Sequence, residues 1–426
     1  MKRVEGQYRK IGCRYMFLRP SPSSTNHAEA TDFAVAFLSL EPTKRDLERL
    51  RIDNIAVGDL VYDSYLRQGN TTIDFGDPGI KKLLVETFLT VQFWLKTLQR
   101  RPGTVIADNV YINAVPARVA ASLGLDVYFV GHENVFRQAT DLPESGQSYR
   151  YYKDWARRLS PENKQSALSE GKRYVEARLQ GAVEGRISHY MEDSQFTLRA
   201  HSSPIKFDRT SQTVLVACHD FYDSPHVWGT NIFPDFYEWL CFLADYAKTS
   251  PYRWLLKPHP NSSERDEALL NRLFGDSPGS LVLSRQTKLA DVLAQNKISA
   301  ALTVCGTIAS ELPAIGIPVI NASVNNPHRD FAFSISPQTE VELAKELDKV
   351  GTHDQPVAMD DLYLYHYFHN VLGPTLDLAQ HLSDPAGSPS GTDTTGLPFR
   401  FRSNVSIPAA VRERLTSFIN DYRYMA

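Results

Sequence analysis

The chain has 426 residues, of which 42% are hydrophobic and 22% are charged, and its formal net charge is −3. This composition is typical of a soluble globular protein, and the length predicts two or three domains. The small negative charge excludes a global electrostatic attraction to nucleic acid, so any anion-binding site has to be local.

The cysteines and the apolar runs indicate in which cellular compartment the protein is expected. Four scattered cysteines form no Cys-x-x-Cys pair, which argues against a zinc site or a disulfide framework and favours a reducing compartment. They are Cys13, Cys218, Cys241 and Cys305. The N-terminal stretch "MKRVEGQYRKIGCRY" lacks the apolar core of a secretory signal, and runs such as "FAVAFLSL" are far shorter than the roughly 20 residues that span a bilayer. We expect a cytoplasmic protein, with peripheral association with the inner membrane left open.

The first half of the chain predicts an α/β domain over residues 1–205. Residues 77–101 have a long helical pattern, and the apolar runs 103–108 and 126–131 are typical of buried strands. The stretch between these two runs, 111–124, predicts a helix that ends at a glycine.

The second half predicts a Rossmann-like domain over residues 206–384. Five short β-rich runs alternate with helical segments, which indicates a parallel sheet covered on both faces. The expected strands are 213–218, 253–257, 281–283, 300–304 and 317–321. The expected helices are 234–248, 264–274, 287–296, 307–316 and 339–348.

Two further segments complete the organisation. The charged helical stretch 151–185 predicts either an outer face or a lobe of its own. Residues 384–398 are rich in Gly, Pro, Ser and Thr and predict a linker, so we assign 385–426 to a linker and a terminal helix that packs back on the body.

Polar side chains follow four of the strands in the second half. His219 follows the first, Lys257 and His259 the second, and Gly306 with Thr307 the fourth, while "ASVNNPHRD" follows the fifth. Because ligands of an open parallel sheet bind beyond the carboxyl ends of its strands, these groups are expected to converge on one cleft.

The predicted convergence suits a nucleotide phosphate. Gly306 lets the backbone approach closely, and the helix that begins near Thr307 offers free N–H groups. Lys257 supplies a charge and His259 a hydrogen bond or charge, while Ser310 and Glu311 lie in the first turns of that helix. Glu311 can accept hydrogen bonds from ribose hydroxyls.

Each of these residues also has a purely structural interpretation. Thr307 caps any helix, Glu311 could be a solvated acid of the first turn, and the two prolines around His259 could simply end a strand. His219 could be a hydrogen-bonded core histidine. In addition, Pro313 inside the helix predicted over 307–316 is expected to shorten or kink it.

The segment from "KPHP" to "ADVLAQNKISAALTVCGTIASELPAIGIPVINAS" resembles glycosyltransferases of the GT-B fold that build bacterial capsule and surface polysaccharides, especially the Kdo transferases. Polysialyltransferases and CDP-glycerol glycerophosphotransferases are remoter relatives. The resemblance covers about 120 residues, roughly 210–330. It implies two Rossmann-like domains facing a cleft, phosphate contacts at Lys257, His259 and Thr307, and a ribose contact at Glu311.

The resemblance also implies the partners and the reaction. The protein would transfer a sugar from a nucleotide-sugar donor, of which a CMP-linked sugar is one candidate, to a growing surface glycan or glycolipid, without a cofactor and without a metal. The general base would come from the N-terminal domain, where Glu133, His132 and Asp108 follow expected strands. Helix capping and loop hydrogen bonding are the alternative roles for these three residues.

Three other functions remain open at this stage. A nucleotide-sugar epimerase or a glycerophosphotransferase would use the same donor cleft. An epimerase also needs acid and base carboxylates near the sugar, and none is identified from the sequence. A non-catalytic nucleotide-sugar-binding subunit would keep the phosphate site and lack a base.

Overall fold

The computed structural model describes residues 24–103, 105–130, 135–137, 152–183, 194–197, 212–352 and 357–372. The linker and terminal helix expected over 385–426 lie outside these residues, so both stay predictions.

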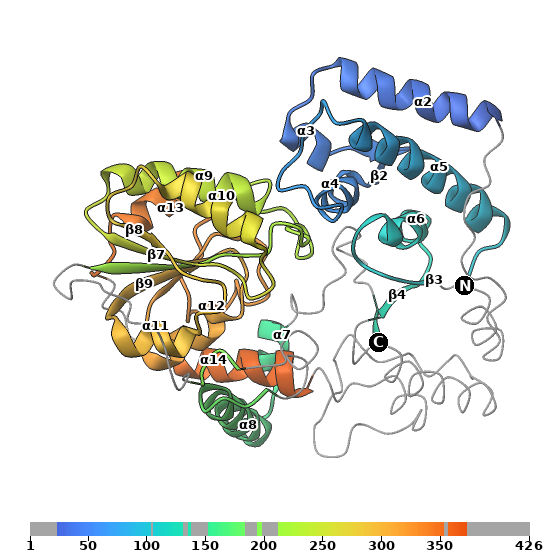
Figure 1. Cartoon of the computed structure of the whole chain (residues 1–426). Coiled ribbons are helices and arrows are strands. Elements are labelled where there is room, and N and C mark those ends of the chain that lie inside the picture. Colours follow the sequence, from blue (N-terminus) through green and yellow to red (C-terminus); the bar gives the residue numbers. More distant parts are fainter. Residues whose placement is uncertain are drawn as a thin grey trace.

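A five-stranded parallel sheet forms the centre of the C-terminal part (Figure 1). Its strands are β6 (Thr213–Ala217), β7 (Arg253–Lys257), β8 (Ser280–Val282), β9 (Ile298–Thr303) and β10 (Val319–Asn321). They lie in the order β10-β9-β6-β7-β8, and all four neighbouring pairs are parallel. This order is that of a Rossmann fold, in which the chain reverses its direction of travel at β6.

Alternate residues of the central strands pack into two separate cores. Val214 and Val216 of β6 belong to one core, whereas Leu215 between them belongs to the other. The first core is closed by α9 (Phe236–Thr249), α10 (Glu264–Phe274) and α13 (Glu340–Leu347). The second is closed by α11 (Leu289–Gln295) and α12 (Ile308–Glu311). Because successive side chains of a strand point to opposite faces, a sheet covered on both sides needs such continuous apolar runs.

The strands and helices expected in the second half are confirmed, with one difference. Where one helix is predicted over 307–316, α12 ends at Glu311 and a 3-10 helix, η4 (Leu312–Ile315), continues the chain. Pro313 is an early residue of η4, and proline cannot donate the backbone hydrogen bond that a longer α-helix requires. The prediction that Pro313 shortens this helix is therefore confirmed.

The N-terminal part is also α/β. Strands β3 (Val105–Ala107) and β4 (Val127–Val130) are parallel, and α6 (Val115–Ser122) connects them, while β5 (Val135–Arg137) pairs antiparallel with β4. The predicted helix 77–101 is α5 (Pro78–Arg100), whose N-cap is Asp77. The α/β fold predicted for both halves of the chain is thus confirmed.

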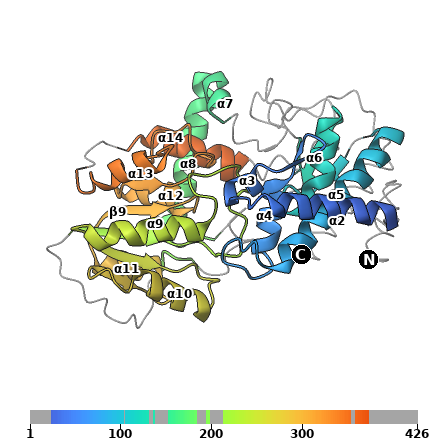
Figure 2. The ribbon, with the colours of Figure 1, turned by 90° about the horizontal axis from the view of Figure 1, so that it is seen from above.

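Several elements of this part were not predicted from the sequence. They are α2 (Ser24–Ser39), α3 (Lys44–Glu48), the short strands β1 (Arg51–Ile52) and β2 (Ile55–Ala56), and α4 (Gly58–Leu66). Helices α2, α4 and α6 all pack against α5. Seen from above, α3 and α4 lie on the side of this part that faces the C-terminal part (Figure 2).

The charged stretch 151–185 contains α7 (Tyr152–Arg158) and α8 (Pro161–Leu179). Helix α8 packs against α14 (Met359–His366) and the π-helical turn η5 (Tyr367–Leu372) that follows it. An aromatic core that includes Trp155 and Phe368 joins these helices. The stretch therefore packs on the C-terminal part in space. The predicted boundary at residue 205 itself lies outside the described residues.

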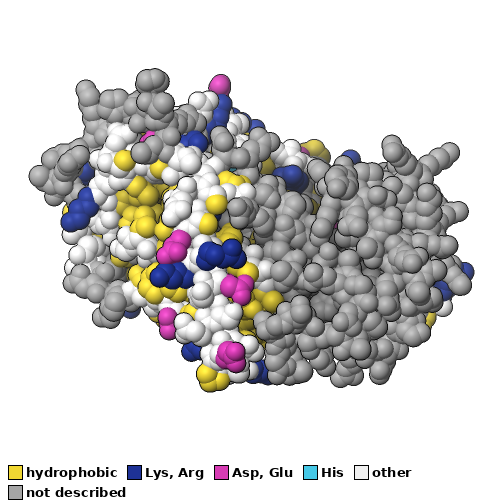
Figure 3. Space-filling model, turned by 90° about the horizontal axis from the view of Figure 1, so that it is seen from below, with side chains coloured by type: hydrophobic (Ala, Val, Ile, Leu, Met, Phe, Trp, Pro, Cys, Tyr) yellow, Lys and Arg dark blue, Asp and Glu magenta, His cyan; other side chains and the backbone are white. Residues whose placement is uncertain are grey.

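The described surface carries charges of both signs. On the face seen from below, the drawn Lys and Arg side chains alternate with Asp and Glu side chains around small apolar patches (Figure 3). In the part of the chain that the structure describes, no helix is long and apolar enough to cross a membrane.

We predict that Gly171→Ala destabilises the protein although alanine favours helix. A Cβ on Gly171 in α8 would lie 2.0 Å from the Tyr363 carbonyl oxygen of α14. Overpacking of this kind costs about 1–3 kcal/mol, which exceeds the gain of about 1 kcal/mol in helix propensity. Urea unfolding should show the loss. Gly103→Ala is the control, because its Cβ would meet no atom within 4 Å. A Gly171→Ala variant as stable as the native chain would contradict the close packing of α8 on α14.

Candidate functional site

The carboxyl ends of β6 and β9 meet at the reversal point of the sheet, and His219 and Thr303 lie there. The Nε2 atom of His219 is 3.3 Å from the Thr303 hydroxyl oxygen, which also accepts a hydrogen bond of 3.1 Å from the Gly306 N–H. The His219 ring stacks on Phe236, with 4.5 Å between the ring centroids. Thr303 therefore connects the loop after β6 with the turn after β9.

The turn after β9 requires glycine at position 306, because the side chains of Thr303 and His219 lie close to its Cα atom. A Cβ at this position would lie 2.7 Å from the Thr303 hydroxyl oxygen and 3.6 Å from His219 Nε2. Any side chain larger than hydrogen would therefore push apart the groups that hold the two strand ends together.

His219 is a neutral imidazole at physiological pH. Burial, reinforced by the nearby His259, lowers the pKa of His219 to about 4. Desolvation penalises the charged form, and a second histidine on the neighbouring strand end adds repulsion. A neutral ring can both donate and accept a hydrogen bond, which suits a role in binding or in proton transfer.

The Lys-Pro-His-Pro turn follows β7 and has a defined geometry. Lys257 is buried, and its Nζ atom donates a hydrogen bond of 3.3 Å to the Pro258 carbonyl oxygen. The Nδ1 atom of His259 accepts a hydrogen bond of 3.2 Å from the Asn261 N–H. In a neutral ring the proton then resides on Nε2, so His259 presents an N–H donor. Burial lowers the pKa of His259, which Asp220 partly opposes.

Two carboxylates lie close to these histidines. Asp220 accepts a hydrogen bond of 3.0 Å from the Tyr222 N–H, and burial raises the pKa of its carboxyl group. Asp223 is exposed and interacts electrostatically with His219, His259 and Asp220. No catalytic role was predicted for these aspartates from the sequence, where Asp220 was considered only as an ion-pair partner of Lys257. Together the four residues form a group that could accept and return protons.

Thr307, Ser310 and Glu311 are engaged within the protein. The Thr307 hydroxyl donates to Glu311 Oε2 at 3.3 Å and does not cap α12, while the Ser310 hydroxyl donates to the Thr307 carbonyl oxygen at 3.1 Å. Arg178 of α8 binds the other oxygen of Glu311 at 2.7 Å, and both side chains are buried. The ribose contact of Glu311 stays a prediction, and it would have to form beside this ion pair.

His366 and Arg178 are neighbours of α12 that the sequence analysis missed. The Nε2 atom of His366 in α14 donates to the Ser310 carbonyl oxygen at 3.0 Å, and its Nδ1 atom accepts from Asn370 at 2.9 Å. Burial lowers the pKa of His366 to about 4. Both residues lie far from α12 in the sequence, and neither belongs to a recognisable motif.

The three predicted base candidates are only partly described. His132 and Glu133 lie outside the described residues, so their roles stay predictions. Asp108 follows β3, is exposed, and accepts a hydrogen bond of 2.7 Å from the Asn109 N–H. Among the described residues, no three or more His, Cys, Asp or Glu side chains are arranged to hold a metal ion.

No protein-family model matches the chain, and no curated protein matches it either. Similar solved structures include the UDP-GlcNAc 2-epimerase of Methanocaldococcus jannaschii in complex with UDP-GlcNAc and UDP, with 12% identity, 66% of this chain and 79% of that chain covered, and a TM-score of 0.28. Another is S. aureus MnaA with UDP, with 13% identity, 68% and 74% covered, and a TM-score of 0.29.

A third similar structure is the UDP-GlcNAc 2-epimerase of Neisseria meningitidis bound to UDP-GlcNAc. It has 11% identity, 68% of this chain and 77% of that chain covered, and a TM-score of 0.29.

We predict that Arg178→Gln lowers the free energy of unfolding by about 3–5 kcal/mol, because it leaves the buried Glu311 carboxylate without its counter-charge. The double variant Arg178→Gln/Glu311→Gln is expected to recover most of this loss, since it removes the remaining buried charge. Chemical denaturation of the two single variants and the double variant measures the coupling. Additive losses would show that the two side chains do not interact.

We also predict that His219 contributes to acid sensitivity. Its folded pKa of about 4 lies below the value of about 6.5 in the unfolded chain, so the unfolded chain binds more protons between these values. Stability is therefore lost as the pH falls from about 6.5 to about 4. His219→Gln should reduce the difference in unfolding free energy between about pH 7 and pH 4.5. An NMR titration midpoint for His219 above about 6.5 would contradict this sign.

Proposed function

We propose that the protein is an enzyme that acts on a nucleotide sugar, with the nucleotide phosphates bound beyond the carboxyl ends of β6, β7 and β9. The observation that carries the proposal is the convergence of His219, His259 and the Gly306 turn at the reversal point of a Rossmann-type sheet. Ligands of such sheets bind at this point. His259 can donate a hydrogen bond there, and Lys257 adds positive charge to the same strand end.

Epimerisation of the sugar is the reaction that the side chains support best. Inverting a carbon centre requires groups that remove a proton and return it, and those groups need pKa values near the working pH. Asp220 has a raised pKa and lies among His219, His259 and Asp223. The carboxylates that an epimerase needs are therefore available beside the proposed phosphate site.

Glycosyl transfer to a surface glycan is the second candidate. It is supported by the resemblance of the segment around "KPHP" to capsule-type transferases, in which Lys257 and His259 would stabilise the leaving phosphate. The base would then come from Glu133, His132 or Asp108, and the acceptor would be a glycan or glycolipid. Cytoplasmic location, possible contact with the inner membrane, and independence of metal and cofactor belong to the same proposal.

We predict that at least one of the UDP-, CDP-, GDP- or CMP-linked sugars raises the melting temperature. A ligand present at 100 times its Kd stabilises the folded state by about 2.7 kcal/mol, which is a shift of several degrees. His259→Ala should reduce this shift. His27→Ala should not, because His27 is exposed on α2. No shift with any of these ligands would overturn the proposal.

The same ligands separate the candidate reactions. In D2O an epimerase incorporates deuterium into the sugar, because the abstracted proton exchanges with solvent, and Asp220→Asn should abolish this signal in the proton NMR spectrum. A transferase leaves the carbon-bound hydrogens unchanged, transfers sugar only when an acceptor is added, and loses turnover in Glu133→Ala. Binding without either reaction would indicate a non-catalytic nucleotide-sugar-binding subunit.

A further inference from the structure

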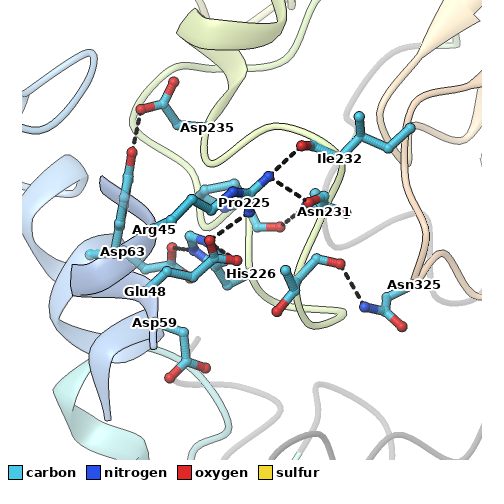
Figure 4. A network of polar contacts seen from close by, with 12 residues as sticks. Arg45, Glu48, Asp59, Asp63, Pro225, His226, Asn231, Ile232, Asp235 and Asn325 are labelled. Atoms are coloured by element: carbon cyan, nitrogen blue, oxygen red, sulfur yellow. Dashed lines mark hydrogen bonds and ion pairs between the residues drawn. The ribbon is translucent and has the colours of Figure 1, made fainter. Parts of the chain in front are cut away.

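A buried charged cluster connects α3 and α4 of the N-terminal part with the loop after β6. The Nδ1 atom of His226 is 2.6 Å from Asp63 Oδ1, and its Nε2 atom is 3.4 Å from Glu48 Oε1. The second Glu48 oxygen binds Arg45 Nη1 at 2.5 Å. His226, Asp63 and Glu48 are exposed by only 5%, 2% and 7%. Figure 4 shows these three side chains close together. The cluster therefore lies between the two parts of the protein, away from water.

The geometry favours a charged His226. Each ring nitrogen faces a carboxylate oxygen, and only the imidazolium carries a proton on both nitrogens. Burial disfavours the charged ring, but Asp63 and Glu48 outweigh it and raise the pKa of His226 to about 10. With Arg45 the cluster contains two cations and two anions, so its charges balance.

The other charged or titratable neighbours leave this balance intact. Asp59 of α4 acts on Asp63 but is itself paired with Arg118 of α6 at 2.5 Å. The Tyr62 ring lies 5.0 Å from the His226 ring, edge to face, and its hydroxyl donates to Asp235. Tyr62 therefore contributes packing to His226 and no charge.

The loop that carries His226 is held from both sides. Arg45 donates a hydrogen bond of 3.0 Å to the Asn231 carbonyl oxygen, and Asn231 in turn donates to the Pro225 carbonyl oxygen at 2.5 Å. From the other side, the Ser323 hydroxyl donates to Asn231 Oδ1 at 2.6 Å, and Asn325 donates to the Thr230 carbonyl oxygen at 2.6 Å. Figure 4 shows Arg45, Asn231 and Asn325 around this loop. The N-terminal helices thus fix the middle of a loop that belongs to the C-terminal sheet.

The same loop starts with His219 and Asp220 and contains Asp223, which lies three residues before His226. We propose that His226 is a positioning residue: its ion pairs with Asp63 and Glu48 hold residues 218–235 in place, so that the site at the end of β6 is complete only while the two parts are docked. The identity of the bound ligand rests on the proposed function, whereas the effect of the cluster on the loop does not.

The energetics of buried ions favour a role of His226 in positioning the loop over a role in stabilising the fold. Removing two charges from water costs about as much as their attraction returns, and apolar replacements of buried ion pairs are often neutral or stabilising. The ions add direction, because the short hydrogen bond between His226 Nδ1 and Asp63 constrains how the ring and the carboxylate lie relative to each other. A loop fixed in this way cannot move without breaking the hydrogen bond of His226 to Asp63 and separating the ring from Glu48.

Hydrogen exchange tests the positioning without any ligand. His226→Gln and Asp63→Asn are expected to speed exchange of the amides in 218–235 at least tenfold at a pH near 7, as measured by mass spectrometry. Lys153→Gln is the control, because it removes an ion pair of 2.6 Å between α7 and α14 that shares no residue with the cluster or with residues 218–235. If both cluster variants remain folded by circular dichroism and their loop exchanges as slowly as in the native chain, the proposal is overturned.

The charge of His226 has its own spectroscopic signature. Its raised pKa means that the contribution of the charged ring is lost as the pH rises through about 10. Burial raises the pKa of Asp63 to about 6, so the pair also loses its negative partner as the pH falls through that value. At about pH 8, nitrogen NMR of the imidazole rings should therefore show a doubly protonated ring that is missing in His226→Gln. A neutral His226 at that pH would contradict the proposed contacts.

Nucleotide binding separates a failure of this proposal from a failure of the proposed function. With UDP, CDP, GDP and CMP as probes in calorimetry, the folded His226→Gln variant should bind at least tenfold more weakly than the native chain, and Lys153→Gln should bind equally well. Native affinity in folded His226→Gln would overturn the positioning role and leave the proposed function intact. If the native chain binds none of the probes, the proposed function fails, and hydrogen exchange alone decides the role of His226.

Discussion

The parallel alignment of β6 with both β7 and β9 is the constraint on which the candidate site depends. The carboxyl ends of parallel strands lie on the same side of a sheet. The segments that follow β6, β7 and β9 are far apart in the sequence, but their polar residues therefore lie together beyond these strand ends. The contact of His219 with the Thr303 hydroxyl is possible only because β6 and β9 are neighbours.

The junction of the two parts is polar as well as buried, which limits how they can dock. Asp235 caps α9 by accepting from the Glu238 N–H at 2.8 Å, and its other oxygen accepts from Tyr62 at 2.5 Å and from Thr72 at 2.6 Å. If the two parts docked in a different position, Tyr62, Thr72 and Asp235 would each lose a hydrogen-bond partner, and a buried polar group without a partner is costly. Together with the cluster around His226, this contact favours one relative placement of the parts over others of similar apolar area.

Helices α8 and α14 contact the segment after β9, although both are distant from it in the sequence. Arg178 reaches Glu311 from α8, and His366 reaches the Ser310 carbonyl oxygen from α14. Since α12 is a single turn, its own hydrogen bonds hold it weakly, and these outside contacts compensate. The residues next to the proposed phosphate site are thus oriented by elements that no sequence motif connects with it.

The sequence by itself determined the five strands of the C-terminal sheet and strands β3 and β4 of the N-terminal part, because hydrophobic periodicity and capping residues act over a few positions. The strand at 253–257, the helix that begins after Ser263, and the break at Pro313 follow from local rules of this kind. It also indicated that His219 and His259 would meet, since strand ends in a parallel sheet have a common edge.

Only the tertiary structure decided which charged side chains pair. Glu311 pairs with Arg178 over a separation of 133 residues, and His226 contacts Asp63 over 163. No periodic pattern marks such pairs, because they depend on how complete elements dock and not on local spacing. For the same reason a surface acid and a buried ion-pair partner look alike in the sequence: burial, which decides between them, is a property of the whole fold.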